Sequence, residues 1–70
     1  MDIKTQIKIL LTLKHISVAQ LAKLISKETG ENYTPAKIYG KLNRDSISFS
    51  ECQVIAKVLG YEIVFKELKN

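Results

Sequence analysis

Apolar residues recur at every third or fourth position through most of residues 1–60, which is the period of amphipathic helices. The pattern predicts helices over about residues 3–14, 18–28, 35–42 and 49–59. From Tyr61 to Leu68 it changes to an imperfect alternation rich in β-branched and aromatic residues, which predicts one strand over about residues 61–67. We therefore expect a mainly α fold of four to five helices followed by a C-terminal strand.

The predicted helix ends carry the residue types that cap helices. Hydroxyl and carboxylate side chains accept hydrogen bonds from free N–H groups at a helix start, and glycine ends helices because it readily adopts the left-handed conformation. The candidate starts are Asp2, the capping boxes Ser17-x-x-Gln20 and Ser48-x-x-Glu51, and Thr34 followed by Pro35, and the candidate ends are Gly30 and Gly60. No linker or repeat interrupts the chain, so we expect one domain over residues 1–70.

Apolar spacing also predicts which face of each helix is buried. In the third helix, Ile38 and Leu42 lie one turn apart and are expected to face the core. The residues expected to face outward there are Ala36, Lys37, Gly40 and Lys41. The inner face of the fourth helix is expected to contain Phe49, Cys52, Ile55, Ala56 and Leu59, with Cys52 as a buried, unreactive thiol.

Length and charge narrow the classes of function. A folded chain of this size still exposes roughly 40% of its unfolded surface, which leaves little room for the deep cleft of a metabolic enzyme. The net charge of +4 lies entirely in residues 1–45, because basic and acidic residues balance in residues 46–70. A localised positive field favours a polyanionic partner, nucleic acid first and an anionic membrane surface second. The alternative is a solvated surface whose charge only keeps the protein in solution.

No set of residues typical of catalysis or metal binding stands out. Cys52 is the only cysteine and His15 the only histidine, and neither has ligand partners at helical spacing. The sequence has no glycine-rich phosphate loop and no nucleophile–base set. We therefore expect no enzyme activity, cofactor, metal or small-molecule substrate.

The sequence also lacks the usual signals for a membrane or a secretory route. No apolar run approaches the roughly 18 residues of a membrane helix. The first ten residues do not have the basic and apolar regions of a secretory signal. We therefore expect a cytoplasmic protein without a membrane partner.

The centre of the chain has the layout of a helix-turn-helix, in which a turn joins a capped helix to a short helix that starts at Thr34. Residues 16–22, 33–42 and 49–60 resemble the Cro/C1-type (Xre-like, lambda-repressor-like) helix-turn-helix family. The best-matched pieces are Gln20-Leu21-Ala22, Thr34 with Ile38, and Ile55-Ala56-x-x-Leu59-Gly60. The resemblance covers about residues 3–60. It implies a bacterial or phage transcriptional regulator that binds double-stranded DNA, with residues 35–42 as the recognition helix.

The resemblance also implies roles for individual residues. Lys37 and Lys41 are expected to face the major groove, and Thr34 to hold a phosphate at the start of the third helix. The further implied DNA contacts are Gln20, Asn43 and Arg44 with the DNA backbone, Ala36 with a thymine methyl group, Gly40 at a close backbone approach, and Tyr39 with a sugar or base. Three of these residues have a structural alternative: a capping box for Gln20, an ion pair with Asp45 for Arg44, and core packing for Tyr39.

Two features depart from the family. Seven residues separate Ala22 from Gly30, so the second helix or its turn is longer by about one helical turn, and Tyr33 is expected to place the third helix by packing. Pro35, Ala36 and Gly40 stand where the family often has polar side chains that bind bases, so base readout is expected to be weak.

A lone strand has no partner in its own chain. We therefore expect residues 61–68 to pair antiparallel with the same strand of a second copy, which makes a homodimer. The alternative function is a protein-interaction or dimerisation module that keeps the helix-turn-helix fold but reads few bases.

Overall fold

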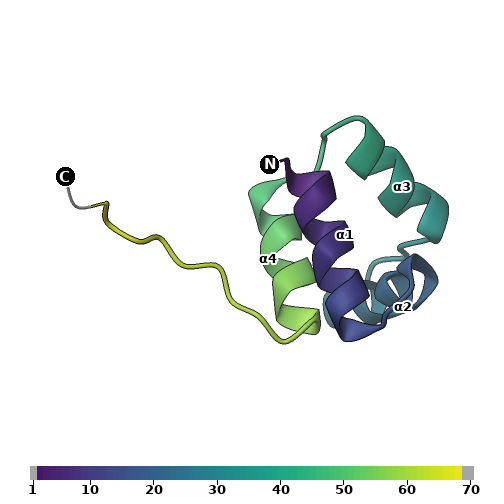
Figure 1. The fold of residues 1–70 in the computed structure, drawn as a ribbon. Coiled ribbons are helices and arrows are strands. Elements are labelled where there is room, and N and C mark those ends of the chain that lie inside the picture. Colours follow the sequence, from purple (N-terminus) through teal and green to yellow (C-terminus); the bar gives the residue numbers. More distant parts are fainter. Residues whose placement is uncertain (1, 69–70) are drawn as a thin grey trace.

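The computed structural model describes residues 2–68 of the chain. This part contains four α-helices: α1 (Ile3–Lys14), α2 (Val18–Thr29), α3 (Pro35–Asn43) and α4 (Phe49–Val58) (Figure 1). The mainly helical fold and the four predicted helices are confirmed. Their ends differ from the prediction by one residue at most, because α2 and α3 are each one residue longer and α4 is one residue shorter.

The helices begin at the capping residues that the sequence predicts. The Oδ1 atom of Asp2 accepts the N–H of Thr5 at 2.8 Å and starts α1. In the capping box of α4, Ser48 Oγ accepts the N–H of Glu51 at 3.1 Å, and Glu51 Oε1 accepts the N–H of Ser48 at 2.9 Å. The capping box predicted for α2 is formed in the same way. These bonds satisfy N–H groups that have no partner inside the helix.

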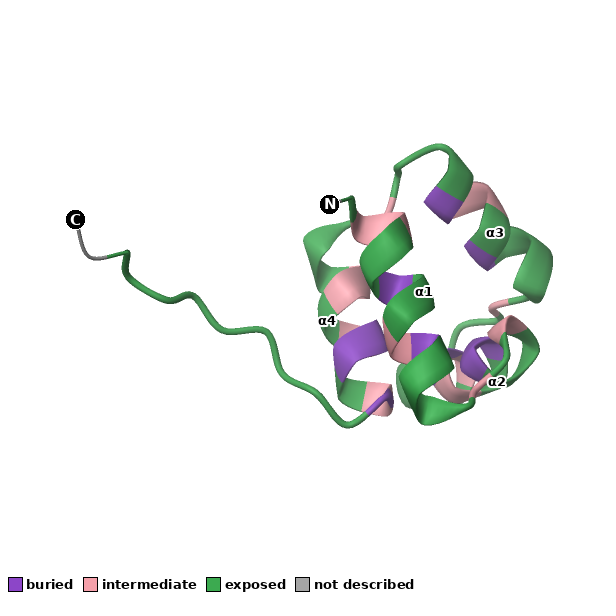
Figure 2. Ribbon diagram, viewed as in Figure 1, coloured by how far each residue is buried: buried purple, intermediate pink, exposed green. Residues whose placement is uncertain are grey.

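The core forms where α2 packs against α3 and α4 and where α1 packs against α3. Leu21 of α2 is at its centre and has no exposed surface. The buried side chains of the described residues are all apolar: Ile7, Leu11, Leu21, Ala22, Ile25, Ile38, Leu42, Ile55, Ala56 and Leu59 (Figure 2). The predicted burial of Ile38 and Leu42 is therefore confirmed, and α3 contributes only these two residues to the core.

The prediction for the inner face of α4 is wrong at Phe49 and only partly met at Cys52. Phe49 is 53% exposed because it occupies the first position of α4, at an open groove beside α1, and its ring stacks on that of Phe65. Cys52 is half-buried rather than buried, although burial still raises the pKa of its thiol.

The predicted strand over residues 61–67 is not formed in the described part of the chain. Residues 61–68, named here the C-terminal arm, run away from the bundle as an extended segment without regular secondary structure (Figure 1). All eight residues of the arm are exposed. The physical reason is that a strand needs a neighbouring backbone to complete its hydrogen-bond ladder, and the described residues of one chain supply none.

No single helix among residues 2–68 is long and apolar enough to cross a membrane. Taken together, α1 and α2 have the length and apolar composition of a membrane span, but the two helices are bent by 97° at their junction.

The central position of Leu21 generates a stability prediction. Leu21→Ala leaves a cavity between three helices and is expected to lower the free energy of unfolding by about 2–5 kcal/mol. Leu13→Ala is the matched control, since Leu13 is 63% exposed on α1, and its effect is expected to stay within about 0.5 kcal/mol. Urea denaturation followed by circular dichroism measures both, and equal losses would contradict the packing described above.

Candidate nucleic-acid interface

A serine on α2 holds the connection that leads into α3. Ser26 Oγ accepts the backbone N–H of Tyr33 at 2.8 Å. Its hydroxyl donates to the carbonyl of Ala22 at 2.8 Å, and the carbonyl of Tyr33 lies 3.2 Å away. This arrangement, named here the Ser26 clasp, fixes the backbone of Tyr33 against α2 just before Thr34 starts α3. As predicted, Tyr33 packs against the core, and the hydrogen bonds of its backbone to Ser26 add a restraint that the sequence did not predict.

The side chain of Tyr33 continues this restraint to α4. Its hydroxyl donates to Glu51 Oε2 at 2.8 Å, and the ammonium of Lys41 lies 3.0 Å from the same oxygen. Together with Ser48, whose N–H binds the other carboxylate oxygen, these residues make the Glu51 cluster. The cluster connects α3, α4 and the segment before α3 through one carboxylate.

The environment of the Glu51 cluster shifts two pKa values. Burial alone raises the pKa of the Glu51 carboxyl, but hydrogen bonds from Ser48, Lys41 and Tyr33, with the charge of Lys41, outweigh burial and lower it to about 2. Burial and the hydrogen bond to Glu51 raise the pKa of the Tyr33 hydroxyl to about 12. The cluster therefore contains an ionised carboxylate and a neutral phenol across the physiological pH range.

The prediction that Lys41 faces outward is wrong. Its side chain is only 25% exposed and is held by Glu51, because its position on α3 faces the start of α4. Lys37, one turn earlier, is exposed as predicted, and its ammonium lies 4.3 Å from the centre of the Tyr33 ring. Of the two lysines predicted to reach the major groove, Lys37 is thus the one presented to solvent.

Arg44 follows the last helical residue of α3 and folds back over Gly40. A β-carbon placed on Gly40 would lie 3.1 Å from Nη1 of Arg44, which is closer than such contacts normally are. The ion pairs of the described residues are Lys41–Glu51 and Lys57–Glu28, so Arg44 does not form the alternative pair with Asp45. The guanidinium group of Arg44 therefore covers part of Gly40. Arg44 itself is exposed, and Gly40 is half-buried.

Thr34 and Gln20 both act as capping residues. Thr34 Oγ1 accepts the N–H of Lys37 at 3.1 Å, and Gln20 Oε1 accepts the N–H of Ser17 at 2.8 Å. The alternative role predicted for Gln20 is therefore present. Each side chain keeps a donor, the Thr34 hydroxyl proton and the Gln20 amide NH₂, which a phosphate oxygen can accept without breaking the cap.

The exposed face of α3 borders a groove that sequence reasoning missed. Tyr39 is 48% exposed, and Ala36 and Asn43 are exposed as well. A groove of about 630 Å³ runs between α1, the start of α2 and α3. Its polar lining consists of Lys8, Thr12, His15, Ser17 and Tyr39. No sequence signal pointed to Lys8, because only the packing of α1 against α3 brings it beside the exposed face of α3.

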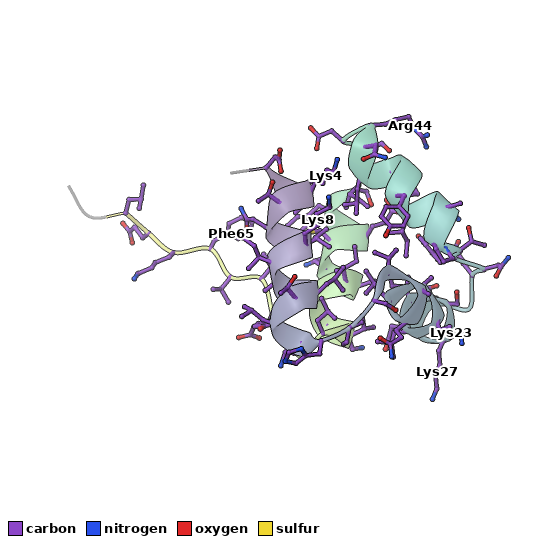
Figure 3. The ribbon with its side chains drawn as sticks, turned by 45° about the vertical axis from the view of Figure 1, so that its right-hand side comes forward. Lys4, Lys8, Lys23, Lys27, Arg44 and Phe65 are labelled. Atoms are coloured by element: carbon purple, nitrogen blue, oxygen red, sulfur yellow. The ribbon has the colours of Figure 1, made fainter. Side chains whose placement is uncertain are left out.

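The lysines of α2 lie elsewhere. Figure 3 shows Lys23 and Lys27 extending from α2 on the side away from α3, whereas Arg44 lies at the end of α3. The positive charge that the sequence places in residues 1–45 is therefore divided between at least two sides of the molecule. Lys8, Lys37 and Arg44 belong to the exposed α3 face or to the groove beside it.

Comparison of the chain with protein-family models, with curated proteins and with solved structures finds no match. Among residues 2–68 there is also no group of three or more histidine, cysteine or acidic side chains that could hold a metal ion.

The Ser26 clasp predicts a loss of stability for Ser26→Ala. This variant leaves the N–H of Tyr33 without its acceptor, so the free energy of unfolding is expected to fall by about 1–2 kcal/mol. Thr12→Ala is the control, because Thr12 Oγ1 binds only a carbonyl of its own exposed helix face. Urea denaturation compares the two, and an equal effect would contradict the clasp.

The pKa of Glu51 predicts an acid-dependent loss of stability. Because the folded pKa of about 2 lies below the ordinary value of 4.5, the carboxylate stabilises the fold above pH 4.5, and this contribution is lost as the pH falls toward 2. Glu51→Gln keeps a capping residue but lacks the charge, so about 2 kcal/mol is expected to be lost at pH 7, with a flatter pH dependence below 4.5. Denaturation at pH 7 and pH 3 tests this, with exposed Glu67→Gln as control; an unchanged pH dependence in Glu51→Gln would overturn it.

Proposed function

We propose that this protein binds double-stranded DNA as a helix-turn-helix protein, with α3 as the recognition helix. The observation that carries the proposal is the exposure of α3: only Ile38 and Leu42 enter the core, while the rest of the helix faces solvent or its immediate neighbours. A helix that is held on one side by Ile38, Leu42 and the Lys41–Glu51 ion pair, and is open on the other, suits insertion into a major groove.

Membership of the Cro/C1-type family is part of the same proposal. It is supported by the helix-turn-helix layout of α2 and α3, in which a turn joins a capped helix to a short helix that starts at Thr34. The function inferred is that of a bacterial or phage transcriptional regulator in the cytoplasm, associated with the nucleoid when bound to DNA.

Phosphate contacts dominate this mode of binding. Lys37 and Arg44 supply the charges, while Thr34, Gln20 and Asn43 supply neutral donors to the DNA backbone. Base contacts are fewer. The methyl group of Ala36 suits a thymine methyl, and Tyr39 offers a hydroxyl and a ring, but Lys41 is held by Glu51, and Arg44 covers Gly40. We therefore expect strong salt dependence and modest sequence preference.

A second copy completes the proposed regulator. Pairing of the C-terminal arms would present two α3 helices to successive major grooves, about 34 Å apart. The exposed apolar arm supports this partner.

The second candidate function is a protein-interaction module that uses the same fold. It is favoured by the exposure of Val64, Phe65 and Leu68, which are 69%, 90% and 85% accessible. In this function α3 does not contact DNA, and the arm binds another protein.

Selection from a random duplex pool at low and moderate salt distinguishes the candidates. A two-fold symmetric motif is the expected result for a dimeric regulator. Salt-sensitive binding without a motif would reduce the function to nonspecific DNA association. No binding at either salt concentration would overturn the DNA proposal and leave the interaction module.

Matched lysine variants test the position of the interface. Lys37→Gln is expected to reduce the slope of log affinity against log salt by about 1, because one phosphate contact is lost. Lys27→Gln removes the same charge from α2 on the side away from α3 and is expected to leave the slope unchanged. Equal slopes for both variants would show that α3 is not the DNA-binding element.

A further inference from the structure

The C-terminal arm turns one face toward its own bundle. The ammonium of Lys14 lies 5.0 Å from the centre of the Tyr61 ring. Ile63 lines a groove between α1 and α4, and Phe65 stacks on Phe49 with ring centroids 6.1 Å apart. The side chains between these odd-numbered residues therefore project from the opposite face, as the two-residue period of an extended chain requires.

The backbone of the arm is available for pairing. The N–H of Tyr61 binds the carbonyl of Ala56 at 2.8 Å, and this is the last backbone hydrogen bond to another segment in the described part of the arm. Beyond it, the extended chain presents N–H and C=O groups together with exposed Val64, Phe65 and Leu68. Such an edge is a template for another strand.

Symmetry restricts how two identical arms can pair. In a symmetric antiparallel ribbon, the two-fold axis runs perpendicular to the plane of the two strands. Rotation about this axis leaves each side chain on the same face of the ribbon as its copy. One residue at the centre must therefore lie opposite its own copy. Centring the ribbon on Glu62 or Lys66 places like charges opposite each other. A ribbon centred on Ile63 leaves Glu62 and Lys66 opposite uncharged residues, so neither gains an attractive partner. A ribbon centred on Phe65 places apolar Ile63 opposite charged Glu67.

We propose that a second copy of this chain pairs with the arm in the antiparallel register centred on Val64. In this register Glu62 lies opposite Lys66 of the partner subunit, and the symmetry repeats that pair. On the face turned to the bundles, Ile63 lies opposite Phe65 of the partner subunit, so apolar side chains meet apolar ones. The inference rests on the dimer of the proposed function and specifies its interface.

The register has a consequence for the assembly. Because the axis is perpendicular to the ribbon, both bundles lie on the same side of it. A ribbon of two strands is marginally stable by itself, so contacts with Phe49 and the groove between α1 and α4 are needed on that side. The arm thereby couples dimer formation to the position of the two bundles.

Complementary charge reversal tests the register directly. Glu62→Lys and Lys66→Glu each place like charges opposite one another in a homodimer, so each variant alone is expected to dimerise at least tenfold more weakly than the natural chain. An equimolar mixture restores both attractive pairs and is expected to form a heterodimer with affinity near that of the natural homodimer. Light scattering and native mass spectrometry measure mass and composition, and circular dichroism checks that the bundle stays folded.

A second mixture tests whether the recovery of dimerisation comes only from the change in net charge. Glu67→Lys changes the charge by the same amount as Glu62→Lys, but Glu67 lies opposite Tyr61 of the partner subunit in this register. Mixing Glu67→Lys with Lys66→Glu leaves one pair of acidic residues opposed and is expected to restore dimerisation only weakly. Equal restoration by both mixtures would overturn the register.

The natural chain itself tests the dimer. A natural chain that stays monomeric at high micromolar concentration without DNA would overturn the interface altogether. DNA binding measured on the same samples keeps this outcome separate from the proposed function, since a monomer that binds DNA refutes only the dimer, and a dimer that does not bind DNA refutes only the DNA proposal.

A cysteine crosslink gives an independent measurement. In a Cys52→Ser background, Val64→Cys is expected to form a disulfide-linked dimer on mild oxidation, because residues directly opposite in a ribbon lie within disulfide range. Lys66→Cys in the same background lies opposite position 62 and is expected to crosslink far less. Preferential crosslinking at position 66 would contradict the register.

Discussion

The carboxylate of Glu51 and the hydroxyl of Ser26 are the constraint on which the position of α3 depends. α3 buries only two side chains, too few to set its orientation by packing alone. Ser26 fixes the backbone before α3, and Glu51 binds Tyr33 on one side of α3 and Lys41 within it. Since Glu51 also caps α4, the start of one helix and the placement of another rely on the same group. Low exposure strengthens these bonds, and the cluster covers an apolar cavity of about 160 Å³.

This restraint determines which charges are free for a partner. Lys41 neutralises Glu51 inside the protein, so it contributes to the position of α3 rather than to an outer surface. Lys37 lies over the ring of Tyr33, which orders its side chain while leaving the ammonium exposed. The accessible cationic groups at the α3 face are therefore few and lie at its edges. For the proposed DNA binding, such a surface favours phosphate contacts over base contacts.

In contrast to α3, which the rest of the protein holds in place, the C-terminal arm has more apolar surface than the helical bundle covers. Tyr61, Ile63 and Phe65 find partial contacts on α1 and α4, but Phe65 remains 90% exposed. A 70-residue chain has few residues with which to cover such a segment. In the proposed dimer, a second copy would supply both the missing backbone partner and the missing apolar surface.

Local features of the sequence determined the helices and their ends. The apolar period predicts α1 to α4 to within one residue, and the capping residues from Asp2 to Ser48 act as expected, because capping depends on neighbours within four residues. The burial of Ile38 and Leu42 follows from their spacing for the same reason.

Only the tertiary structure decided the state of Lys41, Phe49 and the arm. Lys41 has the sequence context of a solvated lysine, and its burial depends on Glu51, ten positions away on another helix. Phe49 lies on an apolar stripe, yet at the start of α4 it only lines an open groove beside α1 and stays 53% exposed. The arm has strand-forming residues, but a strand requires a second backbone, and the described part of one chain has none beside it. Contacts between distant segments leave no signal in the local sequence. The helical period and the capping residues therefore located the helices of the candidate interface. They could not show which side chains of those helices remain exposed to a partner.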